Sequence, residues 1–316
     1  MKNAILIYNP ASGGKKEKRL HAISQVLAVL QSAGVHAEAI ATTHAGSATS
    51  QTQQAVASGF DTVIACGGDG TMNEVLNGLV LSGSDAALGV VPLGSGNLLA
   101  TDLRLPRKPA AAAQALLRYK PRALRPGAIC YQGKNGPVKR YLIVATGVGS
   151  DAELMYRTAT KTKELFGMYA YFLEMLRMAV RRKFSTFNVE WLDDQGSRRT
   201  DRVTLIMGIR AKTFPGVLRR LRLGSELIRN DYRLMLFRTD KVRHFLHFFC
   251  SVASGLNWKV PQVDLAYSTW FRCMPLDAGG PENIHCECDG EVLGRLPVEV
   301  CIEQKTFNLL MPEQGS

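Results

Sequence analysis

Hydrophobic and polar residues in the first 125 positions follow two alternating patterns. Short apolar runs at residues 4–8, 62–66 and 87–92 are typical of buried strands. Apolar residues at a spacing of three or four, as over residues 18–33, 51–58 and 72–80, predict helices between them. Strands that alternate with helices in short units predict a parallel sheet flanked by helices, so we expect a Rossmann-like α/β domain over residues 1–125.

From about residue 126 the pattern becomes β-like, with short apolar runs separated by polar turns. These runs are residues 141–146, 187–192, 203–209, 232–237 and 298–302. Helices are expected only over residues 164–183 and 241–255. The pattern predicts a second, β-rich, β-sandwich-like domain over residues 126–302. It leaves open whether a last strand, near residues 303–312, returns to the first domain.

Composition supports two folded domains. The chain has 316 residues, of which 46% are hydrophobic and 21% charged, which excludes wholesale disorder. No uncharged apolar stretch reaches the roughly 18 residues of a membrane-spanning helix. The first residues read as a strand rather than a signal peptide, so we expect a cytoplasmic protein. Seven cysteines, an odd number without a zinc spacing, predict reduced thiols.

The net charge of +12, from 39 basic and 27 acidic residues, points to an anionic partner. The excess lies in the first 250 residues, whereas residues 251–316 are net acidic. Charge alone leaves nucleic acid, a nucleotide and an anionic membrane open. No nucleic-acid module is visible in the sequence, and we expect no nucleic-acid partner.

The densest glycine motif lies between a predicted buried strand and a helix. Gly67, Gly68 and Gly70 let the backbone approach a ligand closely, and their N–H groups with the following helix N-terminus can cradle an anion. Thr71 could add a hydroxyl donor. A carboxylate beside phosphates, as at Asp69, makes sense if it serves a cation or accepts a proton. A tight turn with a helix-capping aspartate is the plainer alternative.

Two further turns follow predicted strands, at residues 9–14 and 94–97. The carboxyl ends of parallel strands meet at one edge of the sheet, so the three turns can converge on one nucleotide. Neither turn is a Walker A loop, and Leu99 stands where the third glycine of a dinucleotide fingerprint belongs. Each turn alone is a weak signal, but the three together favour a phosphate-bearing ligand.

The order of these motifs resembles the diacylglycerol kinase catalytic domain family, which includes soluble bacterial lipid kinases and sphingosine kinases. NAD kinase and phosphofructokinase share the glycine-rich turn but lack the closing Asp-Gly-Glu element. The matching segments are Asn9-Pro10-x-Ser12-Gly13, Thr43 with Gly46-Ser47-Ala48, Gly67-Gly68-Asp69-Gly70-Thr71 with Asn73-Glu74, Pro92-x-Gly94-Ser95-x-Asn97, and Asp289-Gly290-Glu291. The resemblance thus spans nearly the whole chain.

The resemblance implies roles for the matched positions. The implied ATP-binding residues are Asn9, Pro10, Ser12, Gly13, Thr43, Gly67, Gly68, Asp69, Gly70, Thr71, Asn73 and Ser95. Glu291 is the implied catalytic proton acceptor, and Asp69 is implied in nucleotide–Mg²⁺ binding and catalysis. Phosphoryl transfer depends mainly on positioning and charge neutralisation, with a carboxylate to orient the attacking hydroxyl, and these roles agree with that chemistry. Without the family, Glu291 would read as a surface turn acid.

One departure concerns a structural metal. Several bacterial family members carry Leu-x-x-Asp-Gly-Leu before the strand that matches residues 232–237, and its Asp and backbone carbonyls hold Mg²⁺. This chain has Arg229 where that Asp should be. The structural metal site is therefore in doubt, and the Arg229 guanidinium is our hypothesis for the replacement charge.

The resemblance implies an ATP- and Mg²⁺-dependent lipid kinase of phospholipid biosynthesis, with diacylglycerol the simplest acceptor and the lipid entering between the domains. A sphingoid base, ceramide or phosphatidylglycerol as acceptor stays open, as does a catalytically silent lipid- or nucleotide-binding regulator. We expect peripheral docking on an anionic membrane, and a homodimer is left open. Residues 164–183 could line an acyl pocket, although an ordinary core helix is the plainer alternative.

Overall fold

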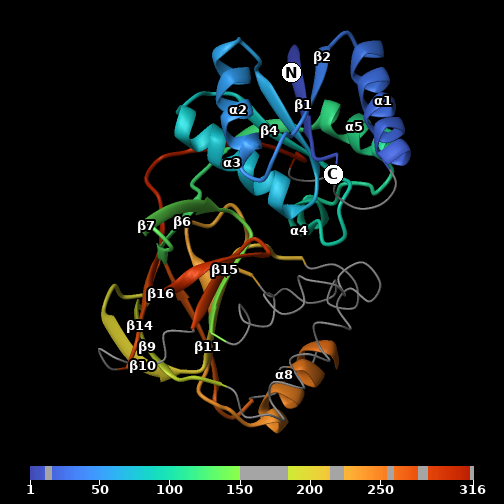
Figure 1. Cartoon of the computed structure of the whole chain (residues 1–316). Coiled ribbons are helices and arrows are strands. Elements are labelled where there is room, and N and C mark those ends of the chain that lie inside the picture. Colours follow the sequence, from blue (N-terminus) through green and yellow to red (C-terminus); the bar gives the residue numbers. More distant parts are fainter. Residues whose placement is uncertain (11–15, 150–183, 214–223, 255–259, 277–283, 314–316) are drawn as a thin grey trace. The chain divides into compact units, whose positions relative to one another are not determined.

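The computed structural model describes residues 1–10, 16–149, 184–213, 224–254, 260–276 and 284–313. Ser12, Gly13 and the helix predicted over residues 164–183 lie outside these ranges. The chain divides into two compact units, residues 1–126 with 303–316 and residues 127–302 (Figure 1). Among the described residues, no helix combines the length and apolar character needed to cross a bilayer.

A six-stranded sheet forms the centre of the first unit, in the order β2-β1-β3-β4-β17-β5. Its strands are β1 (Asn3–Tyr8), β2 (His36–Ala41), β3 (Thr62–Gly67), β4 (Ala87–Pro92), β5 (Lys120–Leu124) and β17 (Phe307–Met311). Strands β1 to β4 run parallel to their neighbours. All residues of β3 and β4 are buried, as expected for apolar strands in the middle of a helix-covered parallel sheet.

Strand β17 returns from the C-terminal end of the chain to this sheet. It pairs parallel to β4 and antiparallel to β5, so it lies between the two. The backbone N–H of Glu303 donates to the carbonyl of Pro126 at 2.9 Å, which brings together the points where the chain leaves and re-enters the first unit. The second unit is thus an insertion between β5 and β17.

Helices cover both faces of the first sheet (Figure 1). They are α1 (Lys16–Ser32), α2 (Ser47–Ala57), α3 (Asp69–Ser82), α4 (Leu98–Asp102) and α5 (Pro109–Arg118). Helix α1 packs against α5, and α2 packs against α3. Helix α2 begins four residues before the apolar pattern predicts, because Gly46, in the left-handed conformation at φ 89°, starts the helix at a polar segment.

The second unit is built on a large antiparallel sheet, which follows the order β10-β9-β14-β16-β15-β8-β11-β12-β13, with β6 paired to β16 and β7. Its strands are β6 (Gly127–Gly133), β7 (Gly136–Leu142), β8 (Ala145–Gly149), β9 (Phe187–Leu192), β10 (Arg198–Val203), β11 (Leu205–Ile209), β12 (Tyr232–Phe237), β13 (Val263–Ser268), β14 (Trp270–Met274), β15 (His285–Cys288) and β16 (Glu291–Ile302). Helix α8 (Val242–Ser254) follows β12 in the sequence.

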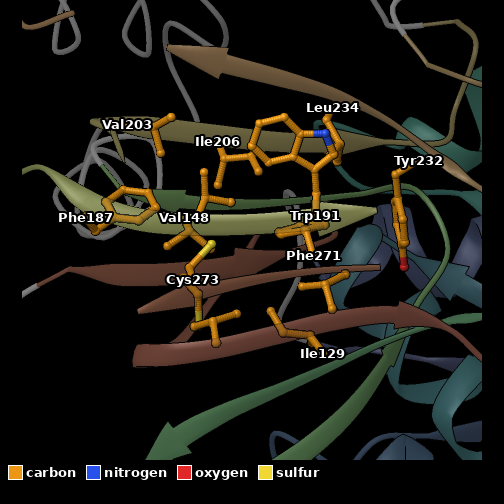
Figure 2. Close-up of a cluster of buried hydrophobic side chains, with 14 of the residues drawn as sticks. Ile129, Val148, Phe187, Trp191, Val203, Ile206, Tyr232, Leu234, Phe271 and Cys273 are labelled. Atoms are coloured by element: carbon orange, nitrogen blue, oxygen red, sulfur yellow. The ribbon is translucent and has the colours of Figure 1, made fainter. Parts of the chain in front are cut away.

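Alternating side chains of these strands form one hydrophobic core (Figure 2). Phe187, Val189 and Trp191 of β9 point into it, while the residues between them are only partly buried. Phe271 packs edge-to-face on Tyr232, with ring centroids 6.1 Å apart. The predicted α/β class, a parallel-sheet domain followed by a β-rich domain, is confirmed.

Candidate functional site

The carboxyl ends of four parallel strands gather the predicted nucleotide-binding turns at one edge of the first sheet. Asn9 and Pro10 follow β1, Thr43 follows β2, and Ser95 follows β4. Backbone hydrogen bonds continue past the strand ends: Thr42 N donates to Tyr8 O at 2.8 Å, and Leu93 N donates to Gly67 O at 2.9 Å. In open α/β sheets this edge is where ligands bind.

The two glycine-rich turns after β3 and β4 touch backbone to backbone. A Cβ at Gly94 would lie 2.5 Å from the Cα of Gly68, closer than real side chains approach. A Cβ at Gly67 would lie 2.6 Å from Oγ1 of Thr71. Asn97 closes the second turn: it adopts a left-handed conformation, and its Oδ1 accepts from Gly94 N at 3.1 Å. Packing therefore requires glycine at positions 67 and 94.

Asp69 joins the two turns through its carboxylate. It is the first residue of α3, and its Oδ1 accepts from the backbone N–H of Leu98, the first residue of α4, at 2.7 Å. A Cβ at Gly96 would lie 2.5 Å from Oδ2 of Asp69. The half-buried carboxylate is thus held at the N-termini of two helices, whose N–H groups and dipoles favour negative charge.

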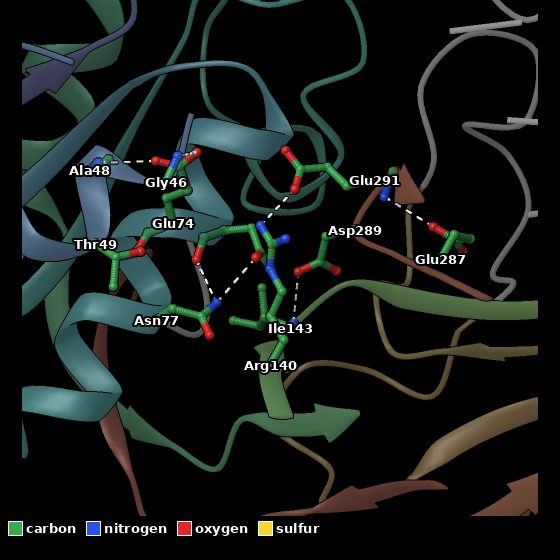
Figure 3. Close-up of polar contacts among 12 residues, drawn as sticks. Gly46, Ala48, Thr49, Glu74, Asn77, Arg140, Ile143, Glu287, Asp289 and Glu291 are labelled. Atoms are coloured by element: carbon green, nitrogen blue, oxygen red, sulfur yellow. Dashed lines mark hydrogen bonds and ion pairs between the residues drawn. The ribbon is translucent and has the colours of Figure 1, made fainter. Parts of the chain in front are cut away.

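Glu74 connects the turn after β2 to helix α3 (Figure 3). Its Oε1 accepts from Gly46 N at 2.7 Å, and its Oε2 accepts from Ala48 N at 3.0 Å. The Ser47 hydroxyl in turn accepts from Thr43 N at 3.0 Å. The carboxylate therefore caps the N-terminus of α2 and fixes the loop that carries Thr43.

The end of β1 is held by a buried arginine. Arg19, on α1, is only 5% exposed, and its Nη1 donates to the carbonyl of Pro10. In the sequence, Arg19 reads only as one of a run of basic residues. The contact fixes Pro10 and the end of β1 against the helix.

Glu291 begins β16 in the second unit and forms an ion pair with Arg140 of β7 (Figure 3). Arg140 Nη2 lies 2.6 Å from Glu291 Oε2, and the two side chains are 23% and 35% exposed. Burial lowers the pKa of Arg140, but the charge of Glu291 and the hydrogen bond that Arg140 donates to it help to raise the pKa overall. Oε1 of Glu291 has no hydrogen bond to any described residue, so one carboxylate oxygen is held and the other is open.

Asp289 is a buried residue that supports the same turn. Its carboxylate accepts from the backbone N–H groups of Ile143, Val144 and Ala145 at 2.8 to 3.1 Å, and the residue is fully buried in a left-handed conformation. Glu287 Oε2 accepts from Gly290 N at 3.1 Å. These bonds make Asp289 a turn-forming residue, and they fix the backbone that presents Glu291.

The structure brings most predicted site residues together within one unit or the other. Gly67, Gly68, Asp69 and Gly70 form one turn beside the loops of Asn9, Pro10, Thr43 and Ser95, whereas Glu291 belongs to the second unit. Thr43 and Ser95 are exposed. Asn73 is fully buried, and its Oδ1 accepts from Asn77 Nδ2 at 3.1 Å, one turn further along α3.

Sequence reasoning missed Arg140 as a partner of the site, and it quoted Glu74 without giving it a role. Arg140 and Glu291 are 151 residues apart, and no local pattern pairs them. Glu74 lies 28 residues from Gly46, whose N–H it accepts. The only signal for Glu74 was its position directly after Asn73 in the glycine-rich motif.

The first unit thus belongs to the class of open α/β proteins that bind ligands at the carboxyl ends of parallel strands. Residues 3–129 match the family model of the diacylglycerol kinase catalytic domain. Over these residues the chain is therefore similar to the diacylglycerol kinase catalytic domain, the family that its motifs indicate.

Relatives match over almost the whole chain. A diacylglycerol kinase of Bacillus subtilis strain 168 is 29% identical over 99% of this chain and 98% of its own length. One from Staphylococcus saprophyticus is 26% identical over 94% and 91%. A crystal structure of a diacylglycerol kinase from Bacillus anthracis strain Sterne superposes with a TM-score of 0.68 at 18% identity, covering 99% of this chain and 97% of that one. The structural match shows a shared fold.

Proposed function

We propose that this chain transfers the γ-phosphoryl group of ATP to a lipid hydroxyl, with diacylglycerol as acceptor and phosphatidate as product. The relatives named as diacylglycerol kinases support the acceptor. The single observation that carries the proposal is the Asp69 carboxylate, held against Leu98 N–H between two glycine turns. Beside bound phosphates, a fixed carboxylate can serve a cation or accept a proton, and neither role arises in an ordinary turn.

The glycine turns supply backbone N–H groups for the ATP phosphates. Gly68 adds no side chain to this surface, and the N-terminus of α3 adds its dipole. Asp69 fits a Mg²⁺ site, because Mg²⁺ is commonly held by one or two carboxylates together with substrate phosphates. When bound there, the ion neutralises developing charge on the phosphates. The role assigned to Asp69 is to hold the ion next to the backbone N–H groups of the two turns.

Glu291 accepts the proton of the lipid hydroxyl. Arg140 holds Oε2, which leaves Oε1 to receive a hydrogen bond from the acceptor. The Asp289 bonds to residues 143–145 keep the turn backbone rigid behind it. We propose that the net basic charge allows reversible docking on an anionic membrane, which would deliver the lipid.

The proposal is tested by incubating the purified chain with γ-labelled ATP, Mg²⁺ and mixed micelles. Separate reactions contain diacylglycerol, sphingosine, ceramide or phosphatidylglycerol. Asp69→Asn and Glu291→Gln are compared with Asp85→Asn and Glu299→Gln, which make the same chemical change at exposed carboxylates of the same units. We expect labelled phosphatidate, a fall of about 10²–10⁴ in kcat for Glu291→Gln and full activity in both controls.

Label in a different lipid would replace diacylglycerol as the acceptor and keep the kinase. No label in any lipid, with ATP still bound, would overturn the kinase in favour of a silent regulator. Unchanged activity in Asp69→Asn or Glu291→Gln would remove that residue from the catalytic assignment.

A further inference from the structure

Arg210 is a fully buried cation in the second unit that no motif singles out. It follows β11, and 0% of the residue is exposed. Its Nη2 donates to two backbone carbonyls, that of Leu227 at 3.0 Å and that of Arg229 at 3.3 Å. The guanidinium thus collects carbonyl oxygens of the turn that leads into β12. Collecting backbone carbonyls around one positive centre is also what a bound metal ion does.

Several groups around Arg210 offset part of the cost of burying its charge. Burial lowers the pKa of Arg210 overall, although Tyr232, Asp289 and Asp231 act in the opposite direction. The guanidinium carbon lies 6.0 Å from the ring centre of Tyr232. Since arginine stays protonated and a buried charge is costly unless it is compensated, these groups and the two carbonyls together hold it in place.

The turn is also fastened to the Arg210 backbone. Glu226 N donates to Arg210 O at 2.8 Å, and Ser225 N donates to Ile209 O at 3.2 Å. On the other side, Arg210 N donates to Val144 O at 2.9 Å, beside the N–H groups that bind Asp289. Arg210 therefore lies between the turn before β12 and the backbone behind Glu291.

Arg229 points elsewhere. Its Nε donates to both Asp231 oxygens at 3.1 Å, and its guanidinium lies 4.7 Å from the centre of the Tyr267 ring. The Arg229 side chain is 51% exposed. The Arg229 charge is therefore paired with Asp231 at the surface, which does not support the hypothesis that its guanidinium replaces the metal ion.

The residues of this turn do not fit the structural Mg²⁺ that the family resemblance implies. Arg229 stands where the ligand aspartate would be, and the carbonyls of Leu227 and Arg229 already accept from a guanidinium. A divalent cation at these carbonyls would lie next to a buried like charge. Among the described residues, no group of three metal-ligating side chains occurs here or elsewhere.

We propose that the Arg210 guanidinium is a built-in cation that holds the turn of residues 225–231 and makes it independent of a structural metal ion. The inference concerns the folding of the second unit and does not rest on the proposed reaction. Its test therefore uses metal content and thermal unfolding, and no activity is assayed.

The experiment uses the full, nucleotide-free chain expressed in Mg²⁺-containing medium and passed through a metal-free gel-filtration column. Elemental analysis is expected to find substoichiometric Mg²⁺ and Ca²⁺, and EDTA is expected to leave the unfolding midpoint unchanged. Arg210→Met should lower the midpoint by at least about 6 °C, because it leaves buried acceptors and charges uncompensated. Arg210→Lys keeps the charge but loses the planar donor set. Its unfolding midpoint should therefore lie between those of Arg210→Met and the unsubstituted chain.

Arg229→Met is the matched control, since it removes a guanidinium from the same turn at the surface. A surface ion pair predicts a shift below about 3 °C. A larger fall in Arg229→Met than in Arg210→Met would overturn the proposal and restore the Arg229 hypothesis. The proposal would also be overturned if the purified chain held one equivalent of Mg²⁺ and removing it with EDTA lowered the unfolding midpoint. If Arg210→Met does not fold, the metal content and EDTA response of the unsubstituted chain still decide.

Discussion

Gly68 and Gly94 lie backbone to backbone, but they differ in how much space each leaves for a side chain. A Cβ at Gly94 would collide with Gly68 at 2.5 Å, whereas a Cβ at Gly68 would meet Gly94 at 3.5 Å, an ordinary contact. Gly68 also has a φ of −93°, which any residue adopts. The packing of the fold therefore explains glycine at position 94 but not at position 68, where the proposed approach of ATP supplies a reason.

This contrast gives a prediction for two alanine variants. Gly94→Ala should lower the free energy of unfolding by about 1–3 kcal/mol through overpacking. Gly68→Ala should unfold like the unsubstituted chain yet bind ATP at least about tenfold more weakly, because its methyl group occupies the cradle. Denaturant unfolding and calorimetric ATP titration measure the two effects. Unchanged ATP affinity in Gly68→Ala would show that phosphates bind elsewhere.

Arg140 is expected to act as a positioning residue for Glu291. Arg140→Met should lower kcat about tenfold or more and leave the KM for ATP unchanged, because the carboxylate loses the bond that orients it. Arg140→Lys should recover part of kcat. A rise in the KM for ATP at constant kcat would contradict this role and assign Arg140 to nucleotide binding.

The predictability of single residues depended on whether their signal was local. Asp69 and the glycines around it were recognisable because they stand within five consecutive positions. Other residues act through partners that are distant in sequence, as Arg140, Arg210 and Glu74 do. The identity of a charged residue does not indicate which distant residue it pairs with. The same limitation explains why Arg229, conspicuous in the motif, was preferred over the buried Arg210.

At the scale of elements, α2 depends on a cap that α3 supplies. Glu74→Ala should lower the free energy of unfolding by about 1 kcal/mol, since two N–H groups of the α2 N-terminus lose their acceptor. Glu17→Ala, in the exposed first turn of α1, is the control and should cost less. Equal losses would show that the Glu74 bonds add nothing beyond the helix dipole.

The start of β1 is joined to the start of β3 by Asp61, and this contact should depend on pH. Burial raises the pKa of Asp61, but hydrogen bonds from Thr62, Lys2 and Asn3 lower it overall. A lowered folded-state pKa means that the contact stabilises the fold fully above the unfolded pKa of about 4 and is lost as the pH falls through the folded value.

The test measures the free energy of unfolding of Asp61→Asn and of the unsubstituted chain at a series of pH values from 7 to 3. We expect a constant difference in stability above about pH 4.5 and a narrowing difference below it. A difference that grows on acidification would contradict the assignment.

Strands were predictable where buried apolar residues form a continuous or alternating run. Strands β9 and β12 have the bounds that their apolar runs predict, and β3 differs by one residue. Strand β10 (Arg198–Val203) was missed because five of its six residues are exposed or partly buried and it presents almost no apolar pattern. It exists because its backbone pairs with β9, a tertiary interaction that side-chain periodicity does not encode.

At the scale of the molecule, the first unit should require its distant strand. Residues 1–126 expressed alone lack β17, which separates β4 from β5, and we expect them not to fold cooperatively. A short flexible linker that joins residue 126 directly to residue 303 should restore the fold, because Glu303 N and Pro126 O are already hydrogen-bonded. Circular dichroism melting and ATP binding compare the two fragments. A cooperative melt of residues 1–126 alone would show β17 to be dispensable.

The insertion of the second unit also sets an order for folding during protein synthesis. Every strand of the second unit emerges from the ribosome before residues 307–311 do, although the first unit begins the chain. The first sheet must then wait with an unfilled position beside β4, and an open strand edge of this kind is prone to aggregation. Of the two units, the one translated earlier is therefore completed later, and a stalled or truncated chain leaves the edge of β4 exposed.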